Sequence, residues 1–327
     1  MKILVTGGFG FIGAKLVESL CEQGHQVRML SRKMPATVVD THGAIEIIQC
    51  DLLDATFALE KVVDGCSVVF NCAGELHNEA LMESLHVDAA RRLVQACKKV
   101  AITSGKPIHW VQLSSVGAYG PAPINASSER IVTEETVPAP VGAYETTKAK
   151  ADELVVAALE EGIFSYSILR PSNVYGVGMP NNSIRQWGRA IQQRLFFYVG
   201  SRGAVSTYVH VDDVIDALVL CGFDDRAKGE IFNISNDCAQ EDVVNAIAKQ
   251  LNVAQPKLRV PEWLIRLVYV VFSSVKGFPL SKSRIEALLV RTRYPTDKLN
   301  LLLGYQPTRD VKETIGEVFL DAVTSKR

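Results

Sequence analysis

The sequence predicts an α/β protein, with a doubly wound parallel sheet and a smaller, mainly helical C-terminal lobe. Three observations lead to this prediction. The apolar run Lys2–Thr6 meets a loop with four glycines and then an amphipathic run, Phe11–Glu22. Short strand-like runs alternate with longer helix-like runs as far as Gly176. Beyond Gly176 this rhythm stops, and from Gln240 onward the pattern is mainly helical.

The first strand, loop and helix form a unit that can hold a dinucleotide. The strand is short, β-branched and apolar, as a strand buried on both faces is. In a Rossmann-type unit the glycines permit a sharp turn and bring backbone N–H groups close to phosphates at the helix N-terminus. The alternative is a plain tight turn. Both GxGxxG and GxxGxxG fit, and the predicted cofactor residues are Gly7, Gly8, Phe9, Gly10, Phe11, Ile12 and Gly13.

The next elements predict where the other cofactor contacts lie. The strand-like runs are Gln26–Ser31, Ile45–Cys50, Val68–Asn71, Ile108–Leu113 and Ser165–Leu169, and the helix-like runs are Thr56–Val63, Glu79–Thr103 and Ala143–Glu161. Ligands of an open parallel sheet lie beyond the carboxyl ends of its strands. After the third strand, Asp51 is placed to accept from an adenine amino group, with Leu52 packed nearby; Asp54 suits a helix cap. After the fourth, the cofactor can cross the small residues Cys72, Ala73 and Gly74.

Two further segments carry groups that could perform chemistry. Tyr144 and Lys148 are four residues apart in a helical run and therefore share a face. A phenol has a pKa of about 10, and a nearby ammonium or nicotinamide ring would favour the phenolate. Ser114 and Ser115 follow the strand Ile108–Leu113, where a hydroxyl could bind a substrate oxygen. The alternatives are an exposed surface pair for the first segment and a helix cap for the second.

The remaining chain suggests two domains. We expect a dinucleotide-binding domain formed by 1–176 and 204–235, and a substrate-binding lobe formed by 177–203 and 236–327. Pro121–Pro140 suggests a surface excursion, Ser183–Gln193 a helix, 207–222 a strand entering a helix, and 229–236 another strand. The apolar stretch Leu267–Phe272 is too short to span a bilayer, which needs about 20 residues.

Composition and charge exclude several classes of protein. The 327 residues carry a net charge of −1, which provides no basic field for nucleic acid or an anionic membrane. Seven cysteines are scattered without a CxxC motif, and the six histidines form neither HxxxH nor HExxH, so we expect no disulfide framework and no metal site. Met1 leads directly into a strand rather than a signal peptide. We therefore expect a cytoplasmic protein.

Taken together, these segments resemble an extended short-chain dehydrogenase/reductase of the NAD-dependent epimerase/dehydratase type. The matching motifs, in family order, are the glycine loop, Asp51-Leu52, Asn71 to Gly74, Ser114-Ser115 with Tyr119-Gly120, Tyr144 with Lys148, Leu169 to Gly176, Val209 to Val214 and Leu303 to Pro307. Tyr208 to Val214 and Tyr294 to Pro307 are also similar to dihydroflavonol reductases and 3β-hydroxysteroid dehydrogenases.

The resemblance implies roles for individual residues. Tyr144 would be the general acid/base, Lys148 would hold the nicotinamide ribose and lower the tyrosine pKa, and Ser115 would orient the substrate oxygen. Pro171, Ser172 and Asn173 would border the nicotinamide. Substrate contacts are expected at Glu75, Ser115, Asn173 and Arg202. A homodimer through the helix Ala143–Glu161 is also expected.

Three departures from the family pattern bear on specificity. Ser31, with Arg32 and Lys33, stands where NAD-preferring members carry an acid; a hydroxyl and two cations favour NADP over NAD. His86 replaces an asparagine that supports a proton relay or orients a loop; a packed histidine is the alternative. Ser206 stands where members that bind nucleotide-sugars carry an arginine, although Arg202, Arg291 and Arg293 could replace it.

The predicted reaction is hydride transfer at a secondary alcohol or ketone. The first hypothesis is an epimerase or reductase acting at C4 of a nucleotide-sugar. The second is an NADPH-dependent reductase or dehydrogenase of a smaller or apolar alcohol, favoured by Ser206. A third, of another class, is a cofactor-sensing regulator without turnover, which the retained Tyr144–Lys148 pair argues against. Val116-Gly117 stands where family dehydratases carry an Asp-Glu pair, which argues against dehydration.

Overall fold

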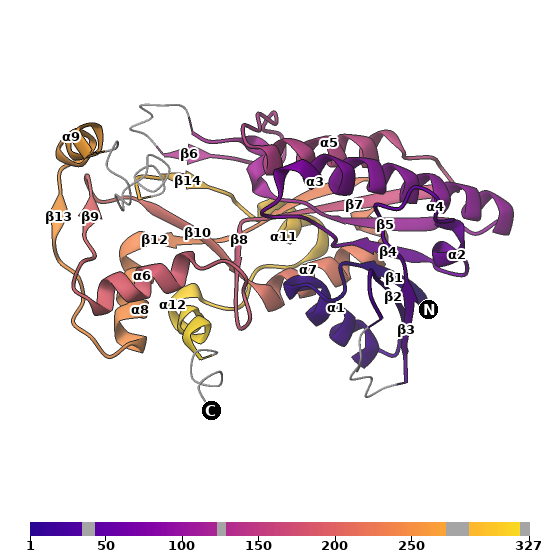
Figure 1. The fold of residues 1–327 in the computed structure, drawn as a ribbon, viewed down its shortest axis with the longest axis horizontal. Coiled ribbons are helices and arrows are strands. Elements are labelled where there is room, and N and C mark those ends of the chain that lie inside the picture. Colours follow the sequence, from indigo (N-terminus) through magenta and orange to yellow (C-terminus); the bar gives the residue numbers. More distant parts are fainter. Residues whose placement is uncertain (35–42, 123–128, 273–287, 321–327) are drawn as a thin grey trace.

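A seven-stranded parallel sheet forms the core of the larger half of the molecule, on the right in Figure 1. The structure is a computed structural model, and it describes residues 1–34, 43–122, 129–272 and 288–320. The sheet has the order β11-β7-β5-β4-β1-β2-β3, and each neighbouring pair is parallel. The strands are β1 (Lys2–Thr6), β2 (Gln26–Ser31), β3 (Ile45–Gln49), β4 (Val68–Asn71), β5 (Ile108–Leu113), β7 (Phe164–Pro171) and β11 (Glu230–Ile234). The predicted fold class is confirmed.

Helices cover both faces of this sheet, so its strands are apolar on both sides. Ile3 and Val5 of β1 pack with α1 (Phe11–Glu22), α7 (Val211–Phe223) and α11 (Asp297–Leu303). Leu4 faces the opposite way and packs with α2 (Glu60–Val63), α4 (Ala90–Ser104) and α5 (Ala143–Ala157). Alternate residues of a strand point to opposite faces, which explains why the continuous apolar run of β1 predicts a buried strand.

The smaller lobe is built on a three-stranded sheet of order β12-β10-β8, with β8 (Asn173–Tyr175), β10 (Val205–His210) and β12 (Asn236–Ala239). Its core includes Tyr175, Ile247 and Val318. The other elements are α6 (Ser183–Gln192), α8 (Gln240–Gln250), α9 (Glu262–Phe272), α12 (Val311–Thr314), the 3-10 helix η4 (Ile315–Phe319), and the parallel pairs β9 (Tyr198–Val199) with β13 (Arg259–Val260) and β6 (Arg130–Ile131) with β14 (Thr292–Arg293). Among the described helices, none is both long and apolar enough to cross a membrane.

The chain passes between the two halves more often than the sequence predicts. The segment 204–235 is expected in the dinucleotide-binding domain. Its helix α7 does pack against the central sheet, and β11 is a strand of that sheet. Its first strand, β10, pairs with β8 and β12 in the smaller sheet. Helix α11, expected in the lobe, packs against the central sheet. The segment before α12 is fixed to α7 by Asp213, which is fully buried and accepts from Tyr305 Oη (3.1 Å), Thr308 N (3.0 Å) and Arg309 Nη1 (2.8 Å).

Two predicted helices differ from the sequence pattern. The run Thr56–Val63 is helical only from Glu60, because Asp54 Oδ1 accepts from both the amide and the hydroxyl of Thr56 and holds a turn there. The run Glu79–Thr103 is interrupted: α3 (Glu79–Glu83) and α4 are joined by a π-helical turn, η1 (Ser84–Ala89). Part of the predicted excursion, 123–128, lies outside the described residues.

Candidate functional site

The glycine loop fits tightly between β1, β4 and α1. Gly7 has a φ of +68°, and a Cβ there would lie 2.8 Å from the carbonyl oxygen of Cys72. A Cβ on Gly13 would collide with the carbonyl oxygen of Gly7, which also accepts from Gly10 N at 2.8 Å. A side chain at Gly8 would meet Met29 of β2. The loop backbone therefore takes a path that only glycines permit.

The start of α1 is suited to an anion. Gly10 is the N-cap, and no side chain of the described residues caps this helix end. The first amides of a helix lack intrahelical acceptors, and the helix dipole is positive there. Phe11 and Ile12 lie in this first turn, while Phe9 is half exposed beside it. This cradle fits a dinucleotide diphosphate, as the sequence predicts.

A buried ladder of polar side chains supports the loop from below. Thr6 Oγ1 donates to Asn71 Oδ1 at 2.6 Å and accepts from Ala73 N at 3.1 Å. Asn71 Nδ2 donates to Gln112 Oε1 at 3.1 Å. Thr6 and Asn71 are the last residues of β1 and β4, Gln112 is the last but one of β5, and the three strands are adjacent. Sequence analysis missed this ladder, although a polar residue at the end of each apolar strand was a usable signal.

The end of β2 presents cations rather than an acid. The Ser31 hydroxyl donates to the carbonyl of Lys33 at 2.5 Å. The Arg32 carbonyl accepts from the Gln49 side chain at 3.3 Å. The Arg32 side chain is exposed and has no acidic partner in the described parts of the chain. Arg32 and Lys33 are thus placed at the rim of the sheet, where sequence reasoning expects the adenine ribose.

The loop after β3 is held by an arginine of α4 that the sequence did not predict to contact it. Asp51 Oδ1 accepts from Leu53 N at 2.9 Å in a local turn, and the residue is exposed. Arg92 of α4 donates to the carbonyls of Leu52 (2.7 Å) and Asp54 (2.8 Å). Leu52 packs against the core beneath α4. Arg92 therefore positions the predicted adenine contacts, and no local sequence pattern indicated it.

The turn after β4 is ordered by its own carboxylate. Glu75 Oε1 accepts from the amides of Leu76 (3.0 Å), His77 (2.8 Å) and Asn78 (3.1 Å), and these hydrogen bonds lower the pKa of Glu75. Cys72 is largely buried, which raises the pKa of its thiol to about 12. The sequence predicts a substrate contact at Glu75, which stays a prediction; in the structure its Oε1 orders the turn.

The two serines after β5 have different environments. Ser114 is buried, and its hydroxyl donates to Asp152 Oδ2 at 2.7 Å while its amide donates to Leu169. Ser115 caps the 3-10 helix η2 (Val116–Tyr119), with its Oγ accepting from Gly117 N at 3.0 Å. The cap that sequence analysis kept as an alternative is therefore real for Ser115. It uses the oxygen as an acceptor, and the hydroxyl hydrogen remains available to donate.

Tyr144 and Lys148 share one face in the first turns of α5. Lys148 is buried, and its Nζ donates to the Leu113 carbonyl at 3.0 Å and lies 6.0 Å from the Tyr144 ring centroid. A Cβ on Gly74 would lie 3.6 Å from Nζ, so the amine faces the turn after β4. Tyr119, which follows the two serines after β5, is fully buried, and its hydroxyl donates to Asn233 at 2.9 Å.

The expectation that Lys148 lowers the pKa of Tyr144 does not hold in this structure. Burial, with smaller effects from the Glu145 and Asp152 carboxylates, raises the pKa of Tyr144 to about 12. Burial also lowers the pKa of Lys148, against the pull of Asp152. The ammonium is directed to the Leu113 carbonyl, which accounts for its weak effect on the phenol. The phenol is therefore protonated at neutral pH here.

A buried ion pair lies one helical turn beyond Lys148. Asp152 Oδ2 accepts from Arg170 Nε at 2.9 Å, and both side chains are at most 5% exposed. Asp152 Oδ1 is buried with no hydrogen-bond partner in the described structure. Burial raises the pKa of Asp152 despite its cationic neighbour. The guanidinium of Arg170 also stacks over Tyr119, 4.9 Å from the ring centroid. The pair joins α5 to β7 behind the catalytic candidates.

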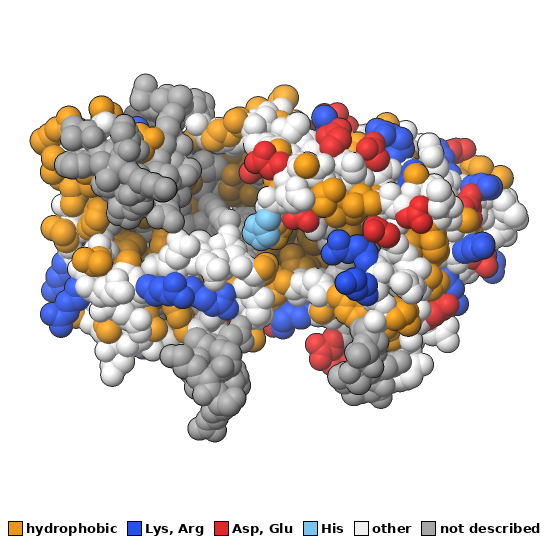
Figure 2. Space-filling model, viewed as in Figure 1, with side chains coloured by type: hydrophobic (Ala, Val, Ile, Leu, Met, Phe, Trp, Pro, Cys, Tyr) orange, Lys and Arg blue, Asp and Glu red, His pale blue; other side chains and the backbone are white. Residues whose placement is uncertain are grey.

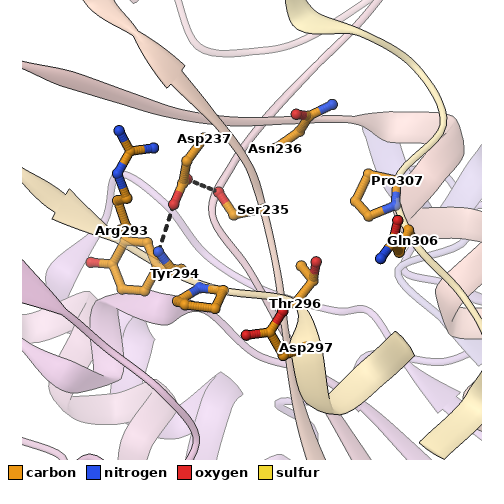
Figure 3. Close-up of a pocket in the computed structure, with 10 residues that line it drawn as sticks. Ser235, Asn236, Asp237, Arg293, Tyr294, Thr296, Asp297, Gln306 and Pro307 are labelled. Carbon is orange, nitrogen blue, oxygen red and sulfur yellow. Dashed lines mark hydrogen bonds between the residues drawn. The ribbon is translucent and has the colours of Figure 1, made fainter. Parts of the chain in front are cut away.

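Pro171, Ser172 and Asn173 cross from the central sheet to the small one. Asn173 donates to the Thr207 carbonyl at 3.0 Å, and Ser172 is buried with its Oγ 2.8 Å from Ser235 Oγ. The Ser235 hydroxyl donates to Asp237, which also accepts from Tyr294 N at 2.6 Å. Figure 3 shows these last three residues on the wall of a cavity of about 340 Å³, between β12 and the loops around Tyr294 and Pro307.

Arg291 reaches the loop between β9 and β10, which carries Arg202. Arg291 Nη2 donates to the Ser201 hydroxyl at 2.5 Å and to the Arg202 carbonyl at 3.1 Å. Arg202 is exposed, whereas Ser206 on β10 is buried. Arg293 pairs with Glu129 instead.

In Figure 2 the molecule is hollowed between the central-sheet half and the lobe. No group of three potential metal ligands occurs among the described residues.

Comparison with known proteins agrees with this geometry. The model of the NAD dependent epimerase/dehydratase family matches residues 3–235. The chain is 30% identical to dTDP-6-deoxy-L-talose 4-dehydrogenase (NAD(P)(+)) of Kitasatospora kifunensis, over 73% of this chain and 74% of that protein. It is 24% identical to 3 beta-hydroxysteroid dehydrogenase/Delta 5-->4-isomerase of Mycobacterium tuberculosis, over 97% of this chain and 89% of that protein.

A solved structure shares the fold over the whole chain. MoeE5 in complex with UDP-glucose and NAD superposes with a TM-score of 0.74, at 24% identity and 100% coverage of both chains. The family match spans the glycine cradle, the Tyr144–Lys148 face and β11. This chain is therefore an NAD(P)-using enzyme that belongs to the NAD-dependent epimerase/dehydratase family.

Proposed function

We propose that this enzyme transfers a hydride between a nicotinamide and a secondary alcohol or ketone of a nucleotide-sugar, at sugar C4, as a 4-epimerase or 4-reductase. The observation that carries the proposal is the placement of Tyr144 and Lys148 on one face of α5, with the lysine turned toward Gly74 and the glycine cradle one strand away. The bound dinucleotide supplies or accepts the hydride.

The proposed roles follow from the hydrogen bonds of each side chain. Tyr144 is protonated at neutral pH, so it can give a proton to a ketone oxygen and take one back from an alcohol. Ser115 can donate to the same substrate oxygen. Lys148 holds the nicotinamide ribose. Asn173 borders the ring from the other side.

The substrate class is supported by two observations. Relatives named for dTDP- and UDP-sugar reactions align with 73–83% of this chain. The loop 200–203 carries the exposed side chain of Arg202, and the Arg291 guanidinium donates to the backbone carbonyl of Arg202; guanidinium groups suit a diphosphate. We propose that these two arginines replace the one that the family carries at the position of Ser206. Arg202→Ala should then raise the KM for a nucleotide-sugar more than it lowers kcat.

We propose NADP as the preferred cofactor. Arg32 and Lys33 flank the end of β2 and suit a 2′-phosphate, while Ser31 offers a hydroxyl. Ser31→Asp would place a carboxylate there that repels the 2′-phosphate and accepts from a 2′-hydroxyl. We expect this change to raise the Kd for NADP about tenfold or more and to lower that for NAD. Equal effects on both would contradict the assignment.

A second candidate function has an observation of its own. Several relatives that align with 95–97% of this chain, including the lobe, are named as steroid or sterol dehydrogenases. Ser206 is buried rather than presented to a diphosphate. Oxidation or reduction of an apolar alcohol with NADP is therefore the alternative.

We also propose a cytoplasmic homodimer with the two-domain division given above, changed so that β10 belongs to the substrate-binding lobe and α11 to the dinucleotide-binding domain. No disulfide joins any of the seven cysteines, all of which lie in the described residues, as in a reducing compartment. The outer faces of α4 and α5 form a cavity of about 700 Å³ lined by Val87, Leu154 and Ala157 among others, and a second copy could pack there. Sedimentation at several protein concentrations tests the dimer.

One experiment separates the candidate reactions. The purified protein is denatured and the released dinucleotide identified. Tightly held NAD at one per chain supports an epimerase, which restores its cofactor within each turnover. Exchangeable NADP supports a reductase, and a panel of dTDP-hexoses, UDP-hexoses and steroid alcohols followed by nicotinamide absorbance then identifies the substrate class. Absence of turnover on the whole panel, despite bound dinucleotide, would contradict the proposed function.

A further inference from the structure

His86 lies where the turn after β4, the start of α5 and the cofactor candidates meet. It is 2% exposed and belongs to the π-helical turn η1, which widens the helix at this point. Its Nε2 lies 2.8 Å from Glu75 N, and its Nδ1 lies 2.7 Å from Thr147 Oγ1. Its ring meets that of Tyr144 edge to face, with centroids 5.6 Å apart and planes at 87°.

The partners of the imidazole fix which nitrogen carries the proton. The Glu75 backbone N–H can only donate, so Nε2 must be the bare acceptor. Nδ1 therefore carries the hydrogen and donates it to Thr147 Oγ1. The Thr147 hydroxyl in turn donates to the Ala143 carbonyl at 2.9 Å. All these hydrogen bonds are satisfied only by the neutral Nδ1–H tautomer.

This arrangement does not conduct protons. A relay needs a chain of groups that can each accept and donate, and here one end is a backbone amide and the other a backbone carbonyl. The charged groups nearest the ring are Lys148, whose Nζ also faces Gly74, and Glu75. Burial and the lysine charge lower the pKa of His86 to about 4, so the ring stays neutral at physiological pH.

We propose that His86 is a positioning residue of the dinucleotide site: a neutral, Nδ1-protonated imidazole that braces the Gly74–Glu75 turn against α5 and fixes the ring of Tyr144. One nitrogen holds the backbone over which the cofactor crosses, and the other holds the first turn of the helix that carries Tyr144 and Lys148. The inference concerns the site of the proposed function, but it requires only dinucleotide binding and no particular substrate.

Two variants separate the two hydrogen bonds. The side-chain amide of glutamine reaches the position of Nε2 and offers an acceptor to Glu75 N, whereas that of asparagine reaches only the position of Nδ1 and the Thr147 hydroxyl. We expect His86→Gln to bind NAD or NADP within about threefold of the original protein. We expect His86→Asn and His86→Ala to raise the Kd about tenfold, because the Glu75 amide is left without its acceptor. His109→Gln is the matched control, because His109 is also buried but lies at the opposite end of β5.

The unaltered protein provides a second measurement that does not depend on a folded variant. Nitrogen NMR of the histidine rings should show His86 with a protonated Nδ1 and a bare Nε2, unchanged between pH 8 and pH 5.5. A protonated Nε2, a titration near pH 6.5, or better binding by His86→Asn than by His86→Gln would overturn the proposal. Failure of every candidate substrate would instead contradict the proposed function and leave these readouts intact.

Discussion

At the scale of single residues, the phenol and the amine of α5 differ from their expected states. Tyr144 is buried enough to hold its proton, and Lys148 is occupied with a backbone carbonyl. A phenol with a raised pKa can donate its proton at neutral pH. It can accept one only after it has been deprotonated, which a further positive charge nearby would favour. The two directions of the reaction should therefore depend differently on pH.

Tyr144→Phe removes the proton donor without changing the packing of the ring. We expect kcat to fall by about 10² to 10⁴, the usual contribution of general acid–base catalysis, with the Kd for dinucleotide changed little. In the original enzyme, alcohol oxidation should accelerate as the pH rises toward the phenol pKa, while ketone reduction should not. Steady-state kinetics in both directions measure this. Full activity of the variant would refute the assigned role.

Asp152→Asn should cost stability rather than chemistry. It leaves the buried Arg170 guanidinium without its counter-charge, which costs about 3–5 kcal/mol in the free energy of unfolding. Lys150→Ala is the control on the same helix, because its ion pair with Glu83 is half exposed and should contribute about 0–1 kcal/mol. Urea denaturation of both variants measures the difference; equal effects would show that burial of the pair does not matter.

At the scale of elements, the sequence predicted most of the helices and strands whose ends are marked by local patterns. The bounds of β1, β2, β4, β5 and α1 agree with the structure, because apolar β-branched runs and a glycine loop are local signals. What it missed depends on distant partners. Arg92 reaches the loop after β3 from 38 residues away, and Thr147 meets His86 from 61 residues away. Spacing along the chain cannot show such contacts.

Gly13→Ala tests the closest approach in the glycine cradle. The added methyl would collide with the Gly7 carbonyl, so the loop must shift and dinucleotide affinity should fall at least tenfold, with about 1–3 kcal/mol lost in stability. Gly24→Ala is the control: its φ of +79° strains an alanine, but open space surrounds it away from the cradle. It should lower the melting temperature and leave affinity unchanged. Wild-type affinity in Gly13→Ala would mean that the loop is not where the phosphates rest.

At the scale of the whole molecule, the two halves are fastened at Asp213. Asp213→Asn removes a fully buried carboxylate from Arg309, whose side chain is partly exposed and keeps Asp216 as a partner, and should cost about 1–3 kcal/mol in the free energy of unfolding. Asp216→Asn removes the second, half-exposed partner of the same arginine and should cost less than about 1 kcal/mol. Chemical denaturation compares them. A similar loss in both would show that the contact at Asp213 is not the one that fastens the halves.

The Asp213 contact also bears on how the chain is made. Six of the seven strands of the central sheet are synthesised by Pro171, but β11 begins only at Glu230, and the partners of Asp213 lie at 305–309. During synthesis from the N-terminus, β7 would remain an open sheet edge until β11 emerges, and the Asp213 carboxylate would lack its partners until 305–309 emerge. We expect nascent chains that stop before Tyr305 to be digested readily by protease, and those that extend beyond Arg309 to resist.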